Sequence, residues 1–279
     1  MHMRFCFFLT TLLFLFSCEV INTEEIIPSS ITIESFEVDG NHSSKITDAW
    51  VYIDNEFQGV FPIPSNFPVL KTAEQEIIIE AGIKKNGISS SRENYPFYTT
   101  FEVNAELLEN KNTSFNPTVS YSLNSFPYNE NFEAVGTSLS VVSDSSNHSI
   151  EKIYDSSNNS YGNYYAKSVI YGEFGELFEC NTPDFDLPKD KIVYLEMDYK
   201  CNAPIIVGIY ANGSSEIDKN TIIYLNKKEE WNKIYISLTE IIYNYNDAND
   251  YKLFFAIPRD TTVAQNEMYL DNIRLLYEE

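Results

Sequence analysis

Short segments rich in Tyr, Phe, Ile, Val and Thr, separated by turn residues, recur along the chain from residue 31 to residue 276. Such side chains favour the pleated, half-buried surface of a β-sheet. The 20 Tyr and 19 Phe of the chain strengthen this pattern. No segment keeps a 3.6-residue apolar period for more than a turn or two, so long helices are not expected. The sequence therefore predicts an all-β protein, and its length allows one large domain or two ordinary ones.

Residues 31–121 are predicted to form the first domain. Strands are expected at 50–53 (WVYI) and 76–80 (EIIIE), and Asn86-Gly87 is a strong hairpin signal. The stretch VYIDNEFQGVFPIP resembles the hairpin of small PEGA-type β-sandwiches, whose pattern is V-Y-V-D-G-x-x-x-G-x-x-P. Asn55 stands where that pattern has its first glycine, and asparagine tolerates the left-handed turn conformation. An immunoglobulin-like sandwich fits this region as well.

Residues 122–130 (SLNSFPYNE) are predicted to be a linker, and residues 131–279 to form the second domain. The strand spacing there is typical of a sandwich or jelly roll. Strands are expected at 139–142, 150–154, 164–170, 174–180, 192–201, 205–210, 221–225, 231–237, 251–257 and 268–276.

Three segments of the second domain resemble the galactose-binding-like jelly rolls that are common among carbohydrate-binding modules. They are NFE at 131–133, EEWNKIYISLTEI at 229–241 and MYLDNIRLLY at 268–277. The resemblance implies that Trp231 packs inside the sandwich, and a sugar-stacking role is the alternative. It also implies a structural Ca²⁺ held by Glu133 and Asp271 with backbone carbonyls, because calcium prefers oxygen ligands. The alternative is that Asp271 only bonds a neighbouring backbone N–H.

Residues 1–17 have the pattern of a leader segment, with one positive charge followed by an apolar run at 5–16. That run is shorter than the ~20 residues needed to span a bilayer, so it suits a signal peptide. Leu15-Phe16-Ser17-Cys18 resembles the lipobox of bacterial lipoproteins. The resemblance implies cleavage before Cys18 and lipid attached to its thiol. An ordinary signal peptide with a chance cysteine is the alternative.

The lipobox resemblance implies a protein of the bacterial cell envelope, anchored in the outer membrane, with the periplasmic or surface face left open. Residues 18–30 are polar and are predicted to be a flexible tether. Glu24-Glu25 resembles the acidic surface-export signals of some Bacteroidota lipoproteins.

A net charge of −22, from 41 acidic and 19 basic residues, excludes a nucleic-acid partner because such a surface repels phosphate. Outside the cytoplasm, disulfides are permitted. Cys180 and Cys201 are therefore expected to form a bridge or to remain two buried free thiols, and spacing alone does not decide between them.

No catalytic motif occurs: neither G-x-S-x-G, H-E-x-x-H, a P-loop, G-x-G-x-x-G nor C-x-x-C is present. His42 and His148 lie in polar Asn-His-Ser contexts that predict surface loops. The protein is therefore expected not to be an enzyme. The abundant carboxylates leave a polysaccharide hydrolase open as the alternative.

The expected function is a non-enzymatic binding or accessory role, with a glycan or an outer-membrane protein as partner. A structural accessory subunit of an outer-membrane complex is a further alternative. Sugar binding needs exposed aromatic rings beside polar groups, and several tyrosines lie in polar surroundings. These candidates are Tyr161, Tyr164, Tyr165, Tyr243 and Tyr245.

Overall fold

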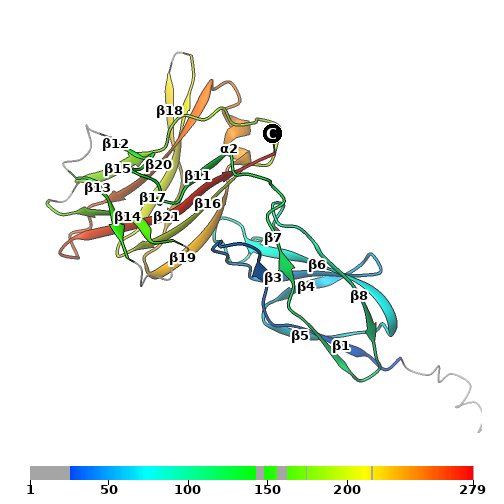
Figure 1. The fold of residues 1–279 in the computed structure, drawn as a ribbon. Coiled ribbons are helices and arrows are strands. Elements are labelled where there is room, and N and C mark those ends of the chain that lie inside the picture. The colour runs from blue at the N-terminus through cyan, green and yellow to red at the C-terminus, as the bar shows by residue number, and fades with distance from the viewer. Residues whose placement is uncertain (1–25, 143–147, 156–161, 174, 215, 279) are drawn as a thin grey trace, which may run out of the picture.

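The computed structural model describes residues 26–142, 148–155, 162–173, 175–214 and 216–278. Cys18, the leader segment 1–17, most of the tether 18–30 and Tyr161 lie outside the described residues. The described chain forms two β-sandwiches joined through residues 120–127 (Figure 1). The all-β prediction is confirmed.

None of the helices in the described part of the chain has the length and apolar character required to cross a membrane.

The first sandwich packs a three-stranded sheet against a five-stranded sheet. The three-stranded sheet has the order β5–β1–β9. The five-stranded sheet has the order β4–β3–β6–β7, and its fifth strand, β8, also pairs with β6, while β2 and β10 form a separate two-stranded sheet. Apolar side chains alternate along these strands, so each strand turns one face into a shared core. Isoleucines fill much of that core, including Ile31, Ile33, Ile53, Ile77 and Ile79. The strands are β1 (Ser29–Ile33), β2 (Glu37–Val38), β3 (Asp48–Ile53), β4 (Glu56–Pro62), β5 (Ser65–Val69), β6 (Ala73–Lys84), β7 (Arg92–Asn94), β8 (Phe101–Leu107), β9 (Asn112–Phe115) and β10 (Thr118–Val119).

Two tight turns of the first sandwich form where the sequence predicts them. Asp54 and Asn55 connect β3 to β4 with φ of 49° and 63°. Two successive left-handed residues match the right-handed twist of the flanking strands, and Asn accepts that conformation. Asn86 and Gly87 also have positive φ, 55° and 68°, in the loop between β6 and β7.

The second sandwich packs two large sheets against each other. One has the order β13–β14–β21–β16–β19, with β11 also paired to β21; we call it the docked sheet, because the first sandwich lies against it. The other, the free sheet, has the order β12–β15–β20–β17–β18. The strands are β11 (Tyr128–Glu130), β12 (Ser140–Val141), β13 (Ile150–Tyr154), β14 (Tyr164–Ile170), β15 (Leu177–Asn181), β16 (Tyr194–Cys201), β17 (Ile205–Asn212), β18 (Ile217–Leu225), β19 (Lys228–Ser237), β20 (Asp250–Pro258) and β21 (Asn266–Leu276).

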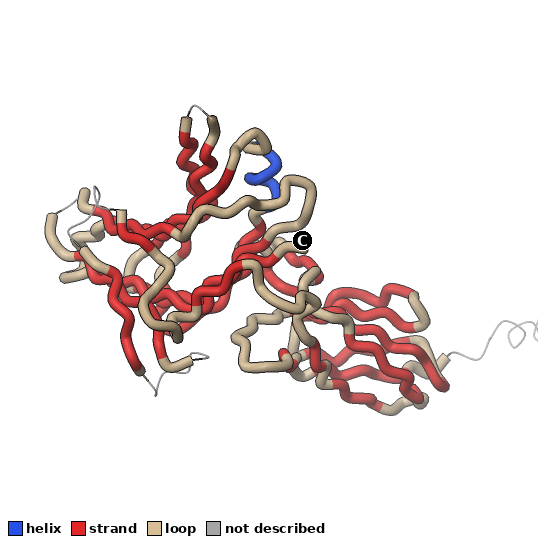
Figure 2. Tube along the Cα trace, turned by 45° about the horizontal axis from the view of Figure 1, so that its top comes forward, coloured by secondary structure: helices blue, strands red, loops and turns tan. Residues whose placement is uncertain are grey.

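The segment predicted to be a linker is partly a strand. Its last residues form β11, in which Tyr128 pairs with Leu275 of β21. The polar composition of residues 122–130 suggested a linker. A short strand that turns few side chains into the core has a similarly polar composition, so composition did not reveal β11. The short helix α2 (Thr239–Asn244) stands out among strands and loops in Figure 2.

The two cysteines of the second sandwich are free thiols, so the bridge that the sequence left open is not formed. Cys180 lies on β15 of the free sheet, whereas Cys201 lies at the end of β16 in the docked sheet. Their sulfurs approach different backbone carbonyls, those of Phe255 and Asn226, each at 3.7 Å. Both side chains instead fill the apolar core between the sheets.

A buried carboxylate joins the two sandwiches. Glu196 of β16 is fully buried and accepts hydrogen bonds from the hydroxyls of Tyr95 and Tyr121, both at 2.7 Å. Lys233 of β19 forms an ion pair with it at 2.8 Å. Because every partner is buried or nearly so, this network fixes which part of the docked sheet the first sandwich covers.

The loop between β6 and β7 adds backbone contacts to the same interface. The Asn86 amide donates to the carbonyl of Tyr235 at 2.9 Å, and the Asn86 side-chain oxygen accepts from the Ser237 amide at 2.9 Å. The hydroxyls of Tyr98 and Tyr235 lie 3.1 Å apart. The first sandwich thus covers one half of the docked sheet and leaves the other half open (Figure 1).

Candidate functional site

The open half of the docked sheet carries three neighbouring aromatic rings, Tyr165, Trp231 and Tyr269, which we call the aromatic platform. Tyr165 lies on β14, Tyr269 on β21 and Trp231 on β19. In the sheet register Tyr269 lies opposite Lys167 on one side and Lys200 on the other. The platform therefore runs across the strands and belongs to the outer face of the sheet.

The three rings are close enough to act as one surface. Ring centroids are 5.5 Å apart for Tyr165 and Trp231, 5.9 Å for Tyr165 and Tyr269, and 6.4 Å for Trp231 and Tyr269. Trp231 and Tyr269 are partly exposed, whereas Tyr165, whose strand lies between other strands of the sheet, is only 9% exposed. An edge-to-face arrangement of this kind holds the rings in place while leaving ring area toward solvent.

Charged side chains border the platform. The Lys200 ammonium lies 4.5 Å from the Tyr269 ring centre, and that of Lys167 lies 5.1 Å from it. Lys167 forms an ion pair with Glu267 at 3.0 Å, and the Tyr269 hydroxyl donates to the same carboxylate at 2.9 Å. Burial, followed by the hydrogen bond to Glu267, raises the pKa of Tyr269, so this hydroxyl stays a hydrogen-bond donor at neutral pH.

This combination of groups can bind a sugar. Aromatic faces offer an apolar surface to the C–H side of a pyranose ring, and the carboxylate, amide and ammonium groups at the border can bond its hydroxyls. Gln265 supplies the amide, since its side-chain nitrogen donates to Glu267 at 2.9 Å. Nothing in this group resembles a nucleophile activated by a base.

The outer face of the free sheet is arranged differently. There Glu179, only 1% exposed, pairs with Lys219 at 2.6 Å and accepts the Tyr210 hydroxyl at 2.5 Å. The Lys219 ammonium also lies 4.7 Å from the ring centre of Phe254, which is 2% exposed. The Phe254 ring is covered, whereas Trp231 and Tyr269 of the aromatic platform are partly exposed, so the platform is the better candidate surface.

The tyrosines proposed from sequence do not gather at one site. Tyr165 belongs to the platform, and Tyr161 lies outside the described residues. Tyr164 packs against the core, Tyr243 is 66% exposed on α2, and the Tyr245 hydroxyl donates to Asn220 at 2.8 Å near the free sheet.

Trp231 does not pack inside the sandwich as the jelly-roll resemblance implied. It is absent from the described core and contacts Tyr165 and Tyr269 on the outer face. Ile234 and Ile236 of β19 face the core, so the alternation of a strand places Trp231, together with Lys233 and Tyr235, on the outer face. Tyr269 was missed in the sequence, although its alternation with Met268 and Leu270 places it on the polar face of its strand.

The calcium candidates lie where the first and last strands of the second sandwich meet. The Glu133 carboxylate accepts the backbone amides of Asn163 and Tyr164 at 2.7 and 2.8 Å. Asp271 is 1% exposed; one of its oxygens accepts the Asn272 amide at 2.7 Å, and the other has no hydrogen-bond partner among the described residues. Burial raises the pKa of Asp271 to about 8, and nearby Asp198 and Glu133 add to that.

The fit to calcium is partial. An unpartnered buried carboxylate oxygen is the kind of ligand that Ca²⁺ takes. However, the described residues contain no group of three or more His, Cys, Asp or Glu side chains placed to hold a metal ion. Backbone carbonyls would have to supply most of the shell.

The two histidines are more enclosed than their polar sequence contexts predict. His42 accepts a hydrogen bond from Arg274 at 3.2 Å across the interface, and burial, followed by the charge of Arg274, lowers its pKa. The His148 side chain is 5% exposed and lies 3.3 Å from Glu176. Both are held by neighbours of their own.

The chain matches no protein-family model and no curated protein sequence. Among solved structures it is similar to a carbohydrate-binding module of the β-sandwich superfamily, with 12% identity and a TM-score of 0.45 over 91% of this chain and 100% of that one. It is also similar to the CBM22-1 xylan-binding domain of Paenibacillus barcinonensis Xyn10C, with 11% identity and a TM-score of 0.41 over 55% of this chain and 94% of that one. The family 11 carbohydrate-binding module of the Clostridium thermocellum cellulase Lic26A-Cel5E gives 12% identity and a TM-score of 0.39 over 55% and 94%. Identities and scores this low leave the ligand of this chain to be argued from its own side chains.

Proposed function

We propose that this protein is a non-catalytic glycan-binding protein that contacts sugar rings through the aromatic platform. One observation carries the proposal: Trp231 and Tyr269 are partly exposed on the half of the sheet that the first sandwich leaves open, and both pack against the buried ring of Tyr165. Lysine and carboxylate groups at its border supply the polar contacts that orient a sugar.

A binding role is preferred to a hydrolytic one on the placement of the acids. A glycosidase needs a carboxylic acid with a raised pKa that reaches an open cleft. Among the described acids, the one whose pKa is raised to about 8 is Asp271, and it is 1% exposed. Release of reducing sugar from a retained polysaccharide would contradict the non-catalytic proposal.

The test is retention of the purified protein on insoluble polysaccharides and on a glycan array. Trp231→Ala is expected to lower affinity about tenfold or more, because it removes the larger of the two partly exposed rings of the platform. Tyr243→Ala is the matched control, since Tyr243 is 66% exposed but lies on α2 away from the platform. Binding by Trp231→Ala equal to the unchanged protein, with its fold verified by thermal unfolding, would overturn the proposal.

We also propose that the protein lies in the bacterial cell envelope and that lipid on Cys18 anchors it in the outer membrane. The lipobox-like Leu15-Phe16-Ser17-Cys18 supports this anchor. The first sandwich, of PEGA or immunoglobulin type, would then serve as a spacer between membrane and ligand. Tritiated palmitate should label the native protein in cells and fail to label Cys18→Ala; equal labelling of both would remove the anchor from the proposal.

An outer-membrane protein partner is the competing role for the same surface. A stoichiometric partner that co-purifies from native membranes and is lost in Trp231→Ala, without retention on any glycan, would favour that accessory role.

A further inference from the structure

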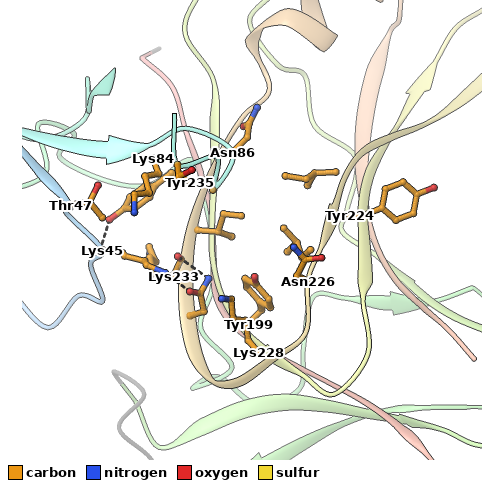
Figure 3. A pocket seen from close by; sticks show the side chains of 16 residues that line it. Lys45, Thr47, Lys84, Asn86, Tyr199, Tyr224, Asn226, Lys228, Lys233 and Tyr235 are labelled. Carbon is orange, nitrogen blue, oxygen red and sulfur yellow. Dashed lines mark hydrogen bonds between the residues drawn. The ribbon is translucent and has the colours of Figure 1, made fainter. Parts of the chain in front are cut away.

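A pocket of about 290 Å³ lies between the two sandwiches (Figure 3), and none of the three platform rings lines it. The first sandwich contributes Lys45 and the loop between β6 and β7, and the second contributes the ends of β18 and β19. Ile223, Leu225 and Ile234 form apolar parts of its wall. Because each sandwich supplies only part of the lining, the pocket exists only when the two are docked.

The charge of this pocket is opposite to that of the protein. The chain has 41 acidic and 19 basic residues, yet the lining contains Lys45, Lys84, Lys228 and Lys233 and no Asp or Glu. The pocket is therefore positively charged although the chain as a whole is strongly negative, and this local excess of positive charge favours a negatively charged ligand.

The four ammonium groups are not equally compensated. Lys233 is paired with the buried Glu196. In the part of the chain that the structure describes, no carboxylate forms an ion pair with Lys45, Lys84 or Lys228. Lys45 donates a hydrogen bond to the neutral side chain of Asn232.

The uncompensated lysines repel one another. Burial lowers the pKa of Lys45, and the charges of Lys228 and Lys84 lower it further. Figure 3 shows these lysines coming from separate segments of the chain toward one region. An anion placed among them would replace mutual repulsion by attraction.

We propose that this pocket binds a small oxyanion, a carboxylate, sulfate or phosphate, carried by a ligand about the size of one sugar residue. Lysine ammonium groups suit such ligands as compact point charges with several donors. The volume is just below the roughly 300–1,000 Å³ typical of small-molecule sites, so the pocket suits a small ligand. Because Lys45 and Lys84 belong to one sandwich and Lys228 to the other, a bound anion bridges the two.

The test is calorimetric titration and thermal unfolding of the whole protein with sodium sulfate, sodium phosphate and sodium glucuronate, with glucose and sodium chloride at matched ionic strength as references. Saturable binding and a higher unfolding temperature are expected with at least one oxyanion and with neither reference. Binding of glucuronate alone would identify an acidic sugar as the ligand, and binding of sulfate or phosphate an inorganic or esterified oxyanion.

Lysine substitutions distinguish a specific anion-binding site from a general effect of positive charge on the protein surface. Replacing both Lys84 and Lys228 by Met should weaken oxyanion binding by about fivefold for each lysine lost. Lys227→Met is the matched control, because Lys227 is adjacent in sequence but pairs with Glu229 and does not line the pocket. Equal binding by the double variant and the control, or no saturable binding of any oxyanion at millimolar concentration, would overturn the proposal. Retention on neutral glycan through the platform should be unchanged in the double variant, so the two proposals fail independently.

Discussion

The outer face of the docked sheet has two halves with similar types of residue. The first sandwich covers one half, and the other half is open and carries the aromatic platform. On the covered half, Tyr194 and Tyr235 are no more than 2% exposed, and the hydroxyls of Tyr95 and Tyr98 have buried partners from the second sandwich. On the open half, Trp231 and Tyr269 keep part of their surface toward solvent. Aromatic and charged side chains occur in both halves, so composition does not distinguish an interface from a ligand surface.

The distinction lies in what satisfies the charged groups. The Glu196 carboxylate is bonded by Tyr95 of the first sandwich, by Tyr121 of the connecting segment and by Lys233 of the second sandwich. At the platform, Glu267 is bonded by Lys167 and Tyr269 of the same sheet. Removing a group should therefore affect stability on the covered half and ligand binding on the open half.

Glu196→Ala should have the largest effect on stability. It would leave the Lys233 ammonium buried without its counter-ion and two tyrosine hydroxyls without their acceptor, which typically costs about 3 to 5 kcal/mol. Denaturant unfolding measures this loss. Glu267→Ala is the control on the open half, and a loss as large as that of Glu196→Ala would erase the proposed distinction between the halves.

Calcium should have the next largest effect, at the boundary between the halves, where Asp198 pairs in register with Asp271. If Asp271 and Glu133 hold Ca²⁺, the ion at about 100 times its dissociation constant should add about 2.7 kcal/mol of stability. Thermal unfolding with Ca²⁺ and with a chelator would show the shift. Asp271→Asn should abolish it, and an unchanged unfolding temperature in the native protein would contradict calcium binding at Asp271 and Glu133.

Strand positions were the part of this fold most accessible to sequence reasoning. Strands expected at 150–154 and 164–170 are β13 and β14 with the same bounds. The Asp54–Asn55 turn also follows from local chemistry, because few residues accept its left-handed conformation. Such features depend on neighbours in the chain and can be read from them.

Contacts between distant strands were beyond that reasoning. Tyr165, Trp231 and Tyr269 meet because β14, β21, β16 and β19 lie side by side, an order that no local pattern encodes. The same limit left the Cys180 and Cys201 pairing open, since only the sheet order shows that they belong to different sheets. Glu196 gave no signal, because its flanking residues predict an apolar strand and its tyrosine partners, Tyr95 and Tyr121, lie 101 and 75 residues earlier in the chain.

Tyr95→Phe should cost less than Glu196→Ala. It removes one hydrogen bond to a buried charged group while the Glu196 carboxylate keeps Tyr121 and Lys233, so about 1.5 kcal/mol is expected. Denaturant unfolding with an unchanged slope would attribute the loss to the native contact. A loss below the error of that measurement would mean that Glu196 does not depend on the first sandwich.

Tyr269→Phe should have the smallest effect on stability and gives the closest contrast to Tyr95→Phe. Both substitutions remove one hydroxyl bonded to one glutamate, at 2.9 Å for Tyr269 and 2.7 Å for Tyr95. Glu267 is partly exposed, so water can replace the lost donor and the change should stay within about 0.5 kcal/mol. Glycan retention should persist, because the ring remains and only its hydroxyl is lost. A loss of stability equal to that of Tyr95→Phe would show that the open half is as tightly constrained as the covered half. In that case the contacts within the sheet, and not a bound ligand, would hold the platform side chains in position.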